Sequence, residues 1–408
     1  MREEKDKPAI RFEGFTDAWE QRKLSSIADR ITRKNAGLES TLPLTISAQY
    51  GLVDQVTYFN NRVASQNISN YYLIKNGEFA YNKSSSDGYP FGAVKRLDLY
   101  EMGVLSTLYI VFALKDQTVS SDFLACYYDT DNWHKQVSER ATEGARNHGL
   151  LNISAEDFLD TDLLVPPDIQ EQALIGDYLK KVDSIITLHQ RKYEKLVTIK
   201  KSCLEKMFPQ NGSLYPEVRF SGYTDPWEQR KFGELYEQVT QKNDLTYGID
   251  RNITVATMQF KSEIRVTEED YLRTYNVFLL GDIAFEGHQS KEFRYGRFVE
   301  NDIGNGIVSH IFAVFRPKMK YDLQFWKYAI NNERLMQPVL SRCTKASTMM
   351  NDLVATDFLA ETFLVPCVEE QQLIGAFISQ LDNLITLHQR ELEKLRNLKK
   401  SLLQQMFV

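Results

Sequence analysis

Two stretches of the sequence combine basic and amide side chains with aromatic residues, as loops that contact nucleic acid do. The first is residues 81–96, YNKSSSDGYPFGAVKR, and the second is residues 285–297, FEGHQSKEFRYGR. Lysine and arginine donate to phosphate oxygens, and arginine, asparagine, glutamine and serine also reach base edges. The candidate DNA-binding residues here are Asn82, Lys83, Ser84, Ser85, Tyr89, Lys95, Arg96, His288, Gln289, Lys291, Arg294 and Arg297. For any one of them, an ordinary surface loop is an equally good interpretation.

A second pair of polar segments follows at residues 140–148 and 342–348. Its candidate DNA-binding residues are Arg140, Arg146, Asn147, Arg342 and Lys345. Both pairs occupy equivalent positions in the two halves of the chain. This repetition favours recognition for the segments as sets.

No group of residues predicts catalysis. The sequence has no G-x-x-x-x-G-K-[ST] phosphate loop and no Asn-Pro-Pro-Tyr motif of an amino-methyltransferase. Residues 165–168 read VPPD, but they precede a predicted helix. The carboxylates are scattered, and the six histidines lack the spacing of metal ligands. We therefore predict neither catalytic nor metal-binding residues.

The sequence is an internal duplication. Residues 8–24 recur as residues 216–232, and eleven of these seventeen positions are identical. Residues 171–208 recur as residues 370–407 without a gap, with 21 identities in 38 positions. The interiors between these blocks share only short likenesses. One fold used twice, with two different surfaces, is the simplest interpretation.

Each closing block has the hydrophobic spacing of a long helix. Apolar residues, with one histidine and one lysine, recur at alternating steps of four and three, as in the seam of a coiled coil. Neither block has proline or glycine after its Ile-Gly step, so each predicts an unbroken helix of roughly 50 Å. The candidate partner-binding residues of these helices are Leu179, Ile186, Leu196, Ile378, Ile385 and Leu395.

Two such helices can pair antiparallel and relate the halves by a pseudo-twofold axis. The pair would then set the distance between the interiors, as a ruler does. An amphipathic helix packed on its own domain is the alternative. The later part of each helix is basic, which is more typical of a solvated face than of DNA contact.

The interiors combine strand and helix patterns. Residues 106–114 and 307–315 predict strands, whereas residues 123–140 and 323–340 predict helices, the second ended or kinked by Pro338. The fold class is therefore α+β, with two similar mixed α/β domains separated by two long antiparallel coiled-coil helices. The predicted domains are residues 1–165 and 211–365, and the predicted helical regions are residues 166–210 and 366–408.

Composition indicates a cytoplasmic protein. No stretch approaches the roughly 18 apolar residues that span a bilayer, and the opening MREEKDK lacks the apolar core of a secretory signal. The four cysteines lie far apart, without C-x-x-C spacing, which suits a reducing compartment. The net charge of −6 argues against a free-standing DNA binder, but not against one subunit of a larger DNA-binding complex.

The order of these features resembles the DNA-specificity subunit of type I restriction–modification enzymes. The resemblance rests on the Trp-Glu-Gln-Arg-Lys openings, the Leu-Val-Pro steps at Leu164 and Leu364, the Glu-Gln…Ile-Gly turns and the helices that end in Met-Phe. It covers essentially the whole chain. It implies two target recognition domains that read a bipartite, non-palindromic sequence in double-stranded DNA.

The same resemblance implies the partners. Two adenine methyltransferase subunits would dock on the helices, and restriction subunits with translocase activity would join them for cleavage. AdoMet, ATP and Mg²⁺ would then belong to those subunits, and no cofactor is expected in this chain. A non-catalytic specificity subunit is thus the leading interpretation. The alternatives are a duplicated protein-interaction scaffold without DNA contact and a self-sufficient restriction–methylation enzyme, which the missing motifs disfavour.

Overall fold

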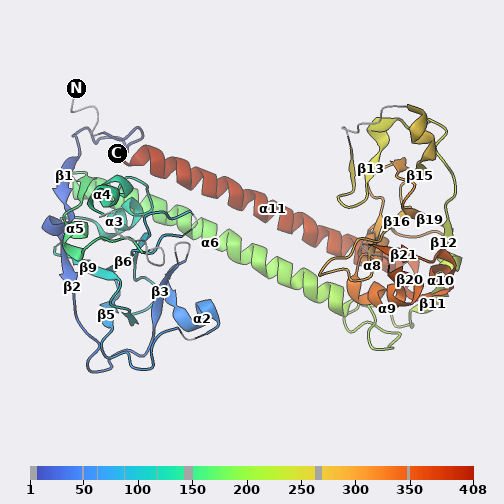
Figure 1. The fold of residues 1–408 in the computed structure, drawn as a ribbon, viewed down its shortest axis with the longest axis horizontal. Helices are drawn as coiled ribbons and strands as arrows, with labels where there is room; N and C mark the ends of the chain where they lie inside the picture. The colour runs from blue at the N-terminus through green and yellow to red at the C-terminus, as the bar shows by residue number, and fades with distance from the viewer. Residues whose placement is uncertain are drawn as a thin grey trace. The chain divides into compact units, whose positions relative to one another are not determined.

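The computed structural model describes residues 7–47, 50–61, 63–86, 88–116, 118–141, 150–261, 269–346 and 350–408. The chain forms two compact units, each with one mixed domain and parts of two long helices (Figure 1). Residues 1–190 and 390–408 make up the first unit, and residues 191–389 make up the second.

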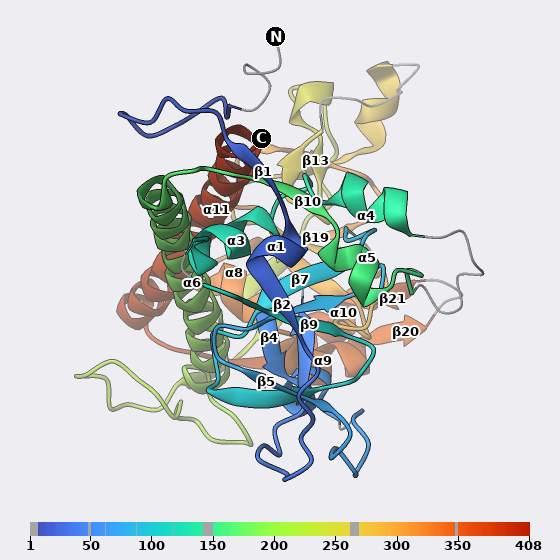
Figure 2. The same cartoon turned by 90° about the vertical axis from the view of Figure 1, so that its left-hand side faces the viewer.

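The first unit is built around a four-stranded antiparallel sheet in the order β2-β9-β6-β7. In Figure 2 this unit faces the viewer, with β1, β2 and β9 in front. Three further antiparallel pairs, β1-β10, β3-β4 and β5-β8, complete it. Its strands are β1 (Glu20–Lys23), β2 (Ala28–Ile31), β3 (Leu44–Ser47), β4 (Gly51–Asp54), β5 (Tyr72–Lys75), β6 (Phe79–Asn82), β7 (Ala93–Arg96), β8 (Met102–Leu105), β9 (Ile110–Leu114) and β10 (Asp162–Val165). Its short helices are α1 (Leu24–Ile27), α2 (Gln55–Phe59), α3 (Ser121–Tyr127), α4 (His134–Arg140) and α5 (Ala155–Leu159).

The second unit repeats this plan with a sheet in the order β12-β19-β16-β17 and the pairs β11-β22, β13-β14, β15-β18 and β20-β21. Its strands are β11 (Glu228–Lys231), β12 (Tyr236–Gln238), β13 (Ile253–Thr254), β14 (Gln259–Phe260), β15 (Asn276–Phe278), β16 (Ile283–Glu286), β17 (Arg297–Glu300), β18 (Gly306–Val308), β19 (Ala313–Pro317), β20 (Thr344–Ala346), β21 (Asn351–Leu353) and β22 (Thr362–Val365). Its short helices are α7 (Phe232–Leu235), η2 (Ile249–Arg251), η3 (Glu269–Thr274), α8 (Leu323–Ile330), α9 (Glu333–Cys343) and α10 (Ala355–Ala360).

Two helices are much longer than the others, as the heptad spacing predicts. They are α6 (Ile169–Lys206) and α11 (Val368–Met406), and each begins shortly after a proline. In the first unit, the start of α6 and the end of α11 lie side by side and run in opposite directions, because Asp183 contacts Lys399 and Gln190 contacts Arg396. The second unit has the matching arrangement.

The end of each long helix completes a core that belongs to the other half of the sequence. In the first unit, Met406 and Phe407 pack among aromatic side chains, and the Phe407 ring lies 6.1 Å from that of Trp19. In the second unit, Phe208 lies 5.9 Å from Trp227. Each core therefore needs residues from both repeats.

The start of each long helix is fixed tightly to its domain. Glu171 is fully buried and accepts two hydrogen bonds from Arg11, at 2.6 and 2.8 Å. Glu370 and Arg219 make the same pair in the second unit, at 2.7 and 2.8 Å. A Cβ atom at Gly176 would lie 2.7 Å from the Asp122 side chain, so the Ile-Gly step allows α6 to approach α3 closely.

The helices of the two interiors differ from the sequence prediction. The predicted helix over residues 123–140 is divided into α3 and α4, and its counterpart is divided into α8 and α9. The Asn332 side chain caps α9 by accepting from the backbone N–H of Arg334, which begins a new helix at that point. Pro338 lies inside α9, which continues to Cys343. No helix of the described residues combines the length and the apolar character needed to cross a membrane.

Candidate nucleic-acid interface

One edge of each central sheet carries the predicted loops. In the first unit β6 is antiparallel to β7 and β9, and its last residue, Asn82, pairs with Ala93. The β6–β7 loop therefore lies beside the start of β9. In the second unit Glu286 pairs with Arg297, which places the β16–β17 loop beside the start of β19. We call these two edges the loop edges.

The chain that follows each of the second pair of predicted segments reaches the same loop edges. The backbone N–H of Leu151 donates to the carbonyl oxygen of Lys83 at 3.0 Å. In the second unit the N–H of Asn351 donates to the carbonyl oxygen of Gly287 at 2.8 Å. In the second unit Ala346 of the predicted segment pairs with Asn351, so the described part of that segment adjoins the β16–β17 loop. Residues 142–148 of the first predicted segment and residues 347–348 of the second lie outside the described residues.

A glycine in the same place shapes each loop. Gly92 and Gly296 have φ angles of 78° and 83°, in the left-handed region that favours glycine. A Cβ atom at Gly92 would lie 2.0 Å from the carbonyl oxygen of Asn82, and one at Gly296 would lie 2.6 Å from that of Glu286. Both loops therefore leave and rejoin the sheet in the same way, although their sequences differ.

The long helices bury one face and expose another. Leu179 and Ile378 of the predicted partner-binding set are fully buried in their own units. Ile186, Leu196, Ile385 and Leu395 are half-buried. Three leucine or isoleucine side chains of each helix, each one residue before a seam position, are exposed and repeat at the same spacing in both helices. These side chains form two exposed stripes, which consist of Leu174, Ile185 and Leu188 on α6 and of Leu373, Leu384 and Leu387 on α11.

The family that shares this duplicated arrangement is described as type I restriction modification DNA specificity domain. Its sequence model matches the chain twice, over residues 17–198 and 224–397, which together are most of the sequence. The chain belongs to this DNA specificity family. It is therefore a DNA-recognition subunit and not a catalytic one, and its two specificity domains account for the duplication.

A solved specificity subunit shares the fold, and two further structures of this kind also align with the chain. The S subunit of a type I restriction–modification system from M. genitalium aligns with 98% of this chain and 99% of its own, at 13% identity and a TM-score of 0.57. The HsdS subunit from Thermoanaerobacter tengcongensis aligns over 95% and 96%, at 15% identity and a TM-score of 0.46. A chain from a structural study of complex assembly in the type I R-M system aligns over 97% and 98%, at 15% identity and a TM-score of 0.49.

In the second specificity domain, most candidate side chains are open to solvent. The exposed candidates are His288, Gln289, Lys291, Arg294, Arg342 and Lys345. Gln289 donates to the side-chain oxygen of Asn351 at 3.2 Å, which links the two segments of the loop edge. These side chains combine positive charge with base-reading groups at one site.

In the first specificity domain, the candidate side chains of the β6–β7 loop are less exposed than those of the second domain. Asn82, Lys83 and Ser84 are half-buried, and the Asn82 side chain accepts from the backbone N–H of Ser84 at 3.1 Å. Tyr89 packs on the hydrophobic cluster beneath β3 and β4, whereas Ser85 is exposed. The candidates Arg146 and Asn147 lie outside the described residues.

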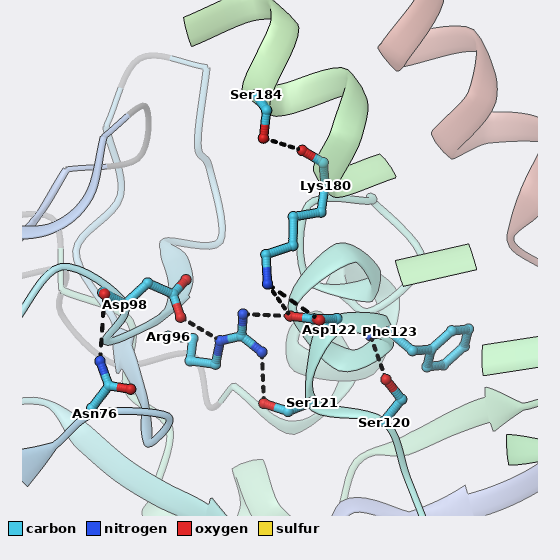
Figure 3. A network of polar contacts seen from close by, with 9 residues as sticks. All are labelled: Asn76, Arg96, Asp98, Ser120, Ser121, Asp122, Phe123, Lys180 and Ser184. Atoms are coloured by element: carbon cyan, nitrogen blue, oxygen red, sulfur yellow. Dashed lines mark hydrogen bonds and ion pairs between the residues drawn. The ribbon is translucent and has the colours of Figure 1, made fainter. Parts of the chain in front are cut away.

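Arg96 lies at the end of β7 that is opposite the loop edge (Figure 3). It donates to Asp98 and Asp122, both at 2.6 Å, and to the Ser121 hydroxyl at 2.8 Å. Burial raises the pKa of the Asp122 carboxyl, but the hydrogen bond and charge of Arg96 outweigh it and lower the pKa. The structure does not bring Arg96 together with the loop, and both of its carboxylate partners hold it in place.

Four other candidates are already paired within the protein. Their partners are Asp129 for Lys95, Asp160 and Asp162 for Arg140, Glu286 for Arg297, and Glu361 for Arg342. Sequence alone could not identify the ion pairs of Lys95, Arg140 and Arg342, because their acidic partners lie 19 to 34 residues away in the chain. Glu286, the partner of Arg297, lies in the same predicted loop segment. Among the described residues, no three histidine, cysteine or acidic side chains gather as a metal site requires.

At each loop edge, a tight turn occupies residues that the sequence pattern predicts as strand. Residues 106–109 connect β8 to β9, and residues 309–312 connect β18 to β19. Their continuous hydrophobic pattern indicated one strand in each copy. The serine that begins each turn, Ser106 or Ser309, is the one signal in the sequence that could have shown the break.

Proposed function

We propose that each specificity domain reads one half of a bipartite, non-palindromic DNA target. Residues 1–165 and 211–365 would be the target recognition domains, with helical regions at residues 166–210 and 366–408. The observation that supports this proposal is that the two units share their backbone arrangement but differ in their loop side chains. The sheets, the loop glycines and the helix starts match in both units, whereas the side chains on the loop edges differ. Two domains with the same backbone arrangement but different hydrogen-bond donors would read different bases.

A domain exchange tests independent reading. Residues 25–160 are replaced by the equivalent segment of another specificity subunit, and the methylated motif is determined by single-molecule sequencing in cells that carry the methyltransferase partner. We expect one half of the motif to change and the other to stay. An exchange of the helical block 171–208 is the matched control. A change in both halves of the motif would overturn independent reading.

Exposed cations of the second loop edge give a residue-level test. Lys291→Ala should weaken binding of all DNA sequences and lower the salt slope by about 1, because it removes a phosphate contact. Arg294→Ala should relax selectivity at one base pair, by about 1–3 kcal/mol. Lys320→Ala is the control, since Lys320 is exposed beyond the far end of β19. Equal losses for Lys320→Ala and Lys291→Ala would contradict the assignment.

We also infer that the exposed stripes bind the partners. One stripe lies on the start of each long helix, so the chain offers two equivalent apolar sites, which suits two methyltransferase subunits. Restriction subunits would join this complex in the cytoplasm. AdoMet, ATP and Mg²⁺ would be held by these partner subunits. Ile185→Asp should abolish one methyltransferase contact and Leu384→Asp the other, as measured by the mass of the co-purified complex.

The net charge adds an expectation about affinity. The isolated chain has a formal charge of −6, so its acidic side chains outnumber its basic ones, and we expect it to displace few counterions from DNA. We expect weak binding alone and much tighter binding with the methyltransferase. Filter binding between about 50 and 200 mM salt measures both affinity and slope. Equal values with and without the partner would contradict this expectation.

A further inference from the structure

We propose that Leu108 and Ile311 are apolar DNA contacts, one at each loop edge, that recognise the methyl group of thymine. This inference rests on the proposed reading of DNA by the two loop edges. Leu108 is 60% exposed and Ile311 is 63% exposed, each at the tip of a tight turn. An exposed aliphatic side chain is common on protein surfaces. Its repetition at the same point of two units with different loops needs a reason.

The two turns have equivalent positions and similar internal bonds. Each turn leads directly into the strand, β9 or β19, that pairs with β6 or β16 next to the polar loop. The backbone N–H of Tyr109 donates to the carbonyl oxygen of Ser106, and that of Phe312 donates to Ser309, both at 3.1 Å. The aliphatic side chain is therefore held outward by a closed turn.

A lysine lies near each tip. Lys242 donates to the Asn276 side chain at 2.7 Å, and Asn276 in turn donates to the carbonyl oxygen of Phe312 at 3.0 Å. In the first unit the Lys34 ammonium lies 4.1 Å from the centre of the Tyr72 ring. Tyr72 on β5 pairs with Leu105, which immediately precedes the turn. Both lysines are exposed. An exposed cation beside an aliphatic tip suits a polyanion better than an apolar protein surface.

The chemistry of the major groove defines the contact. The C5 methyl of thymine is the one aliphatic group that the bases present there, and apolar side chains distinguish it from cytosine. A leucine or isoleucine at a turn tip can reach this methyl while the neighbouring polar loop reads hydrogen-bonding groups. The turn would thus add an apolar element to a polar reading surface.

The matched control is Leu99, which is 63% exposed and follows β7 at the opposite edge of the same sheet. Leu108→Ala and Leu99→Ala are compared in the full chain with its methyltransferase partner. We expect Leu108→Ala to weaken binding of target DNA about tenfold, from the lost apolar contact. The loss should be the same factor at every salt concentration, because no phosphate contact is removed. Leu99→Ala should bind as the parent does.

Ile311→Ala and Leu280→Ala form the same comparison in the second unit, since Leu280 is exposed just before β16. Replacing thymines of the target singly by uracil removes the methyl alone. One such replacement in a half-site should weaken the parent complex and leave the Leu108→Ala or Ile311→Ala complex unchanged. The inference is overturned if both tip variants bind like their controls, or if every uracil has the same effect on variant and parent. If the parent complex itself shows no preference for any DNA sequence, the proposed function fails instead.

Discussion

At the scale of single residues, the two units place opposite charges at one position. Arg96 pairs with Phe79 across β6 and β7, and Glu300 pairs with the equivalent Ile283. Arg96 is balanced by two aspartates. Glu300 is 3% exposed, and neither of its carboxylate oxygens has a hydrogen-bond partner in the described part of the chain. Burial raises the pKa of Glu300 well above its ordinary value, and the charge of Asp302 raises it further.

Glu300→Gln should therefore stabilise the second unit at alkaline pH. A carboxyl group whose pKa is raised by folding stabilises the fold fully below its unfolded pKa, and this contribution is lost as pH rises through the folded value. We expect the variant to gain stability at pH 8 and to gain little or nothing at pH 5. Hydrogen exchange of the β16 and β17 amides measures the difference.

Glu292→Gln is the control for this prediction, because Glu292 is exposed in the adjacent loop. It should leave the exchange rates unchanged at both pH values. If Glu300→Gln destabilises β17 equally at pH 5 and pH 8, Glu300 has a partner in solution and is ionised in the folded protein.

At the scale of elements, the long helices were predictable and the short ones were not. Heptad spacing predicted the bounds of α6 and α11 to within a few residues, because a periodic pattern over so many helical turns is a strong signal. The predicted helix in each interior is divided into two helices, and a local hydrophobic pattern does not show where tertiary packing ends a helix. The loop segments were found from their residue types, whereas the ion pairs of Arg96 and Arg140 depend on contacts distant in sequence.

The lysines at the matching seam positions have a clear structural role. Lys399 donates to Asp129 and Asp183 at 2.9 Å each, and Lys200 contacts Asp382 at 2.6 Å in the second unit. Burial lowers the pKa of Lys399, but the charges of Asp129 and Asp183 outweigh it and raise the pKa. Each lysine thereby fixes the register of the two helices within its unit.

Lys399→Met should loosen the end of α11 in the first unit. It leaves Asp183 unpaired and removes one of two cations from the half-buried Asp129, which we expect to cost about 2–3 kcal/mol. Faster amide exchange over residues 390–406 is the readout. Lys394→Met is the matched control on the same helix, because Lys394 is exposed and its bond to Glu391 contributes little. Equal exchange in the two variants would show that the seam lysine does not set the register.

At the scale of the whole molecule, the two units divide both long helices at equivalent residues, Gln190 and Gln389. Paired insertions of seven residues after both positions keep the heptad phase and add about 10 Å of helix, or roughly three base pairs of DNA. If the helices act as a ruler, the untouched spacer of the methylated motif should lengthen by that amount. Insertions at Glu171 or Glu370 would break buried ion pairs instead.

A three-residue insertion at the same two positions is the control for phase. It should disturb the seam and reduce methylation. A spacer of unchanged length in an active seven-residue variant would show that the helices connect the domains without measuring the distance between them.

The packing of Phe407 has a consequence for the order in which the protein forms during synthesis. The second unit receives Met207 and Phe208 from chain that leaves the ribosome before its own strands, so its core can close as soon as those strands are made. The first unit lacks Leu402, Met406 and Phe407 until the whole second specificity domain has been translated, although its sheet is made first. Domains near the N-terminus usually fold first on the ribosome. Here the earlier domain must wait, with the surface around Trp19 unfilled, for the last turns of α11.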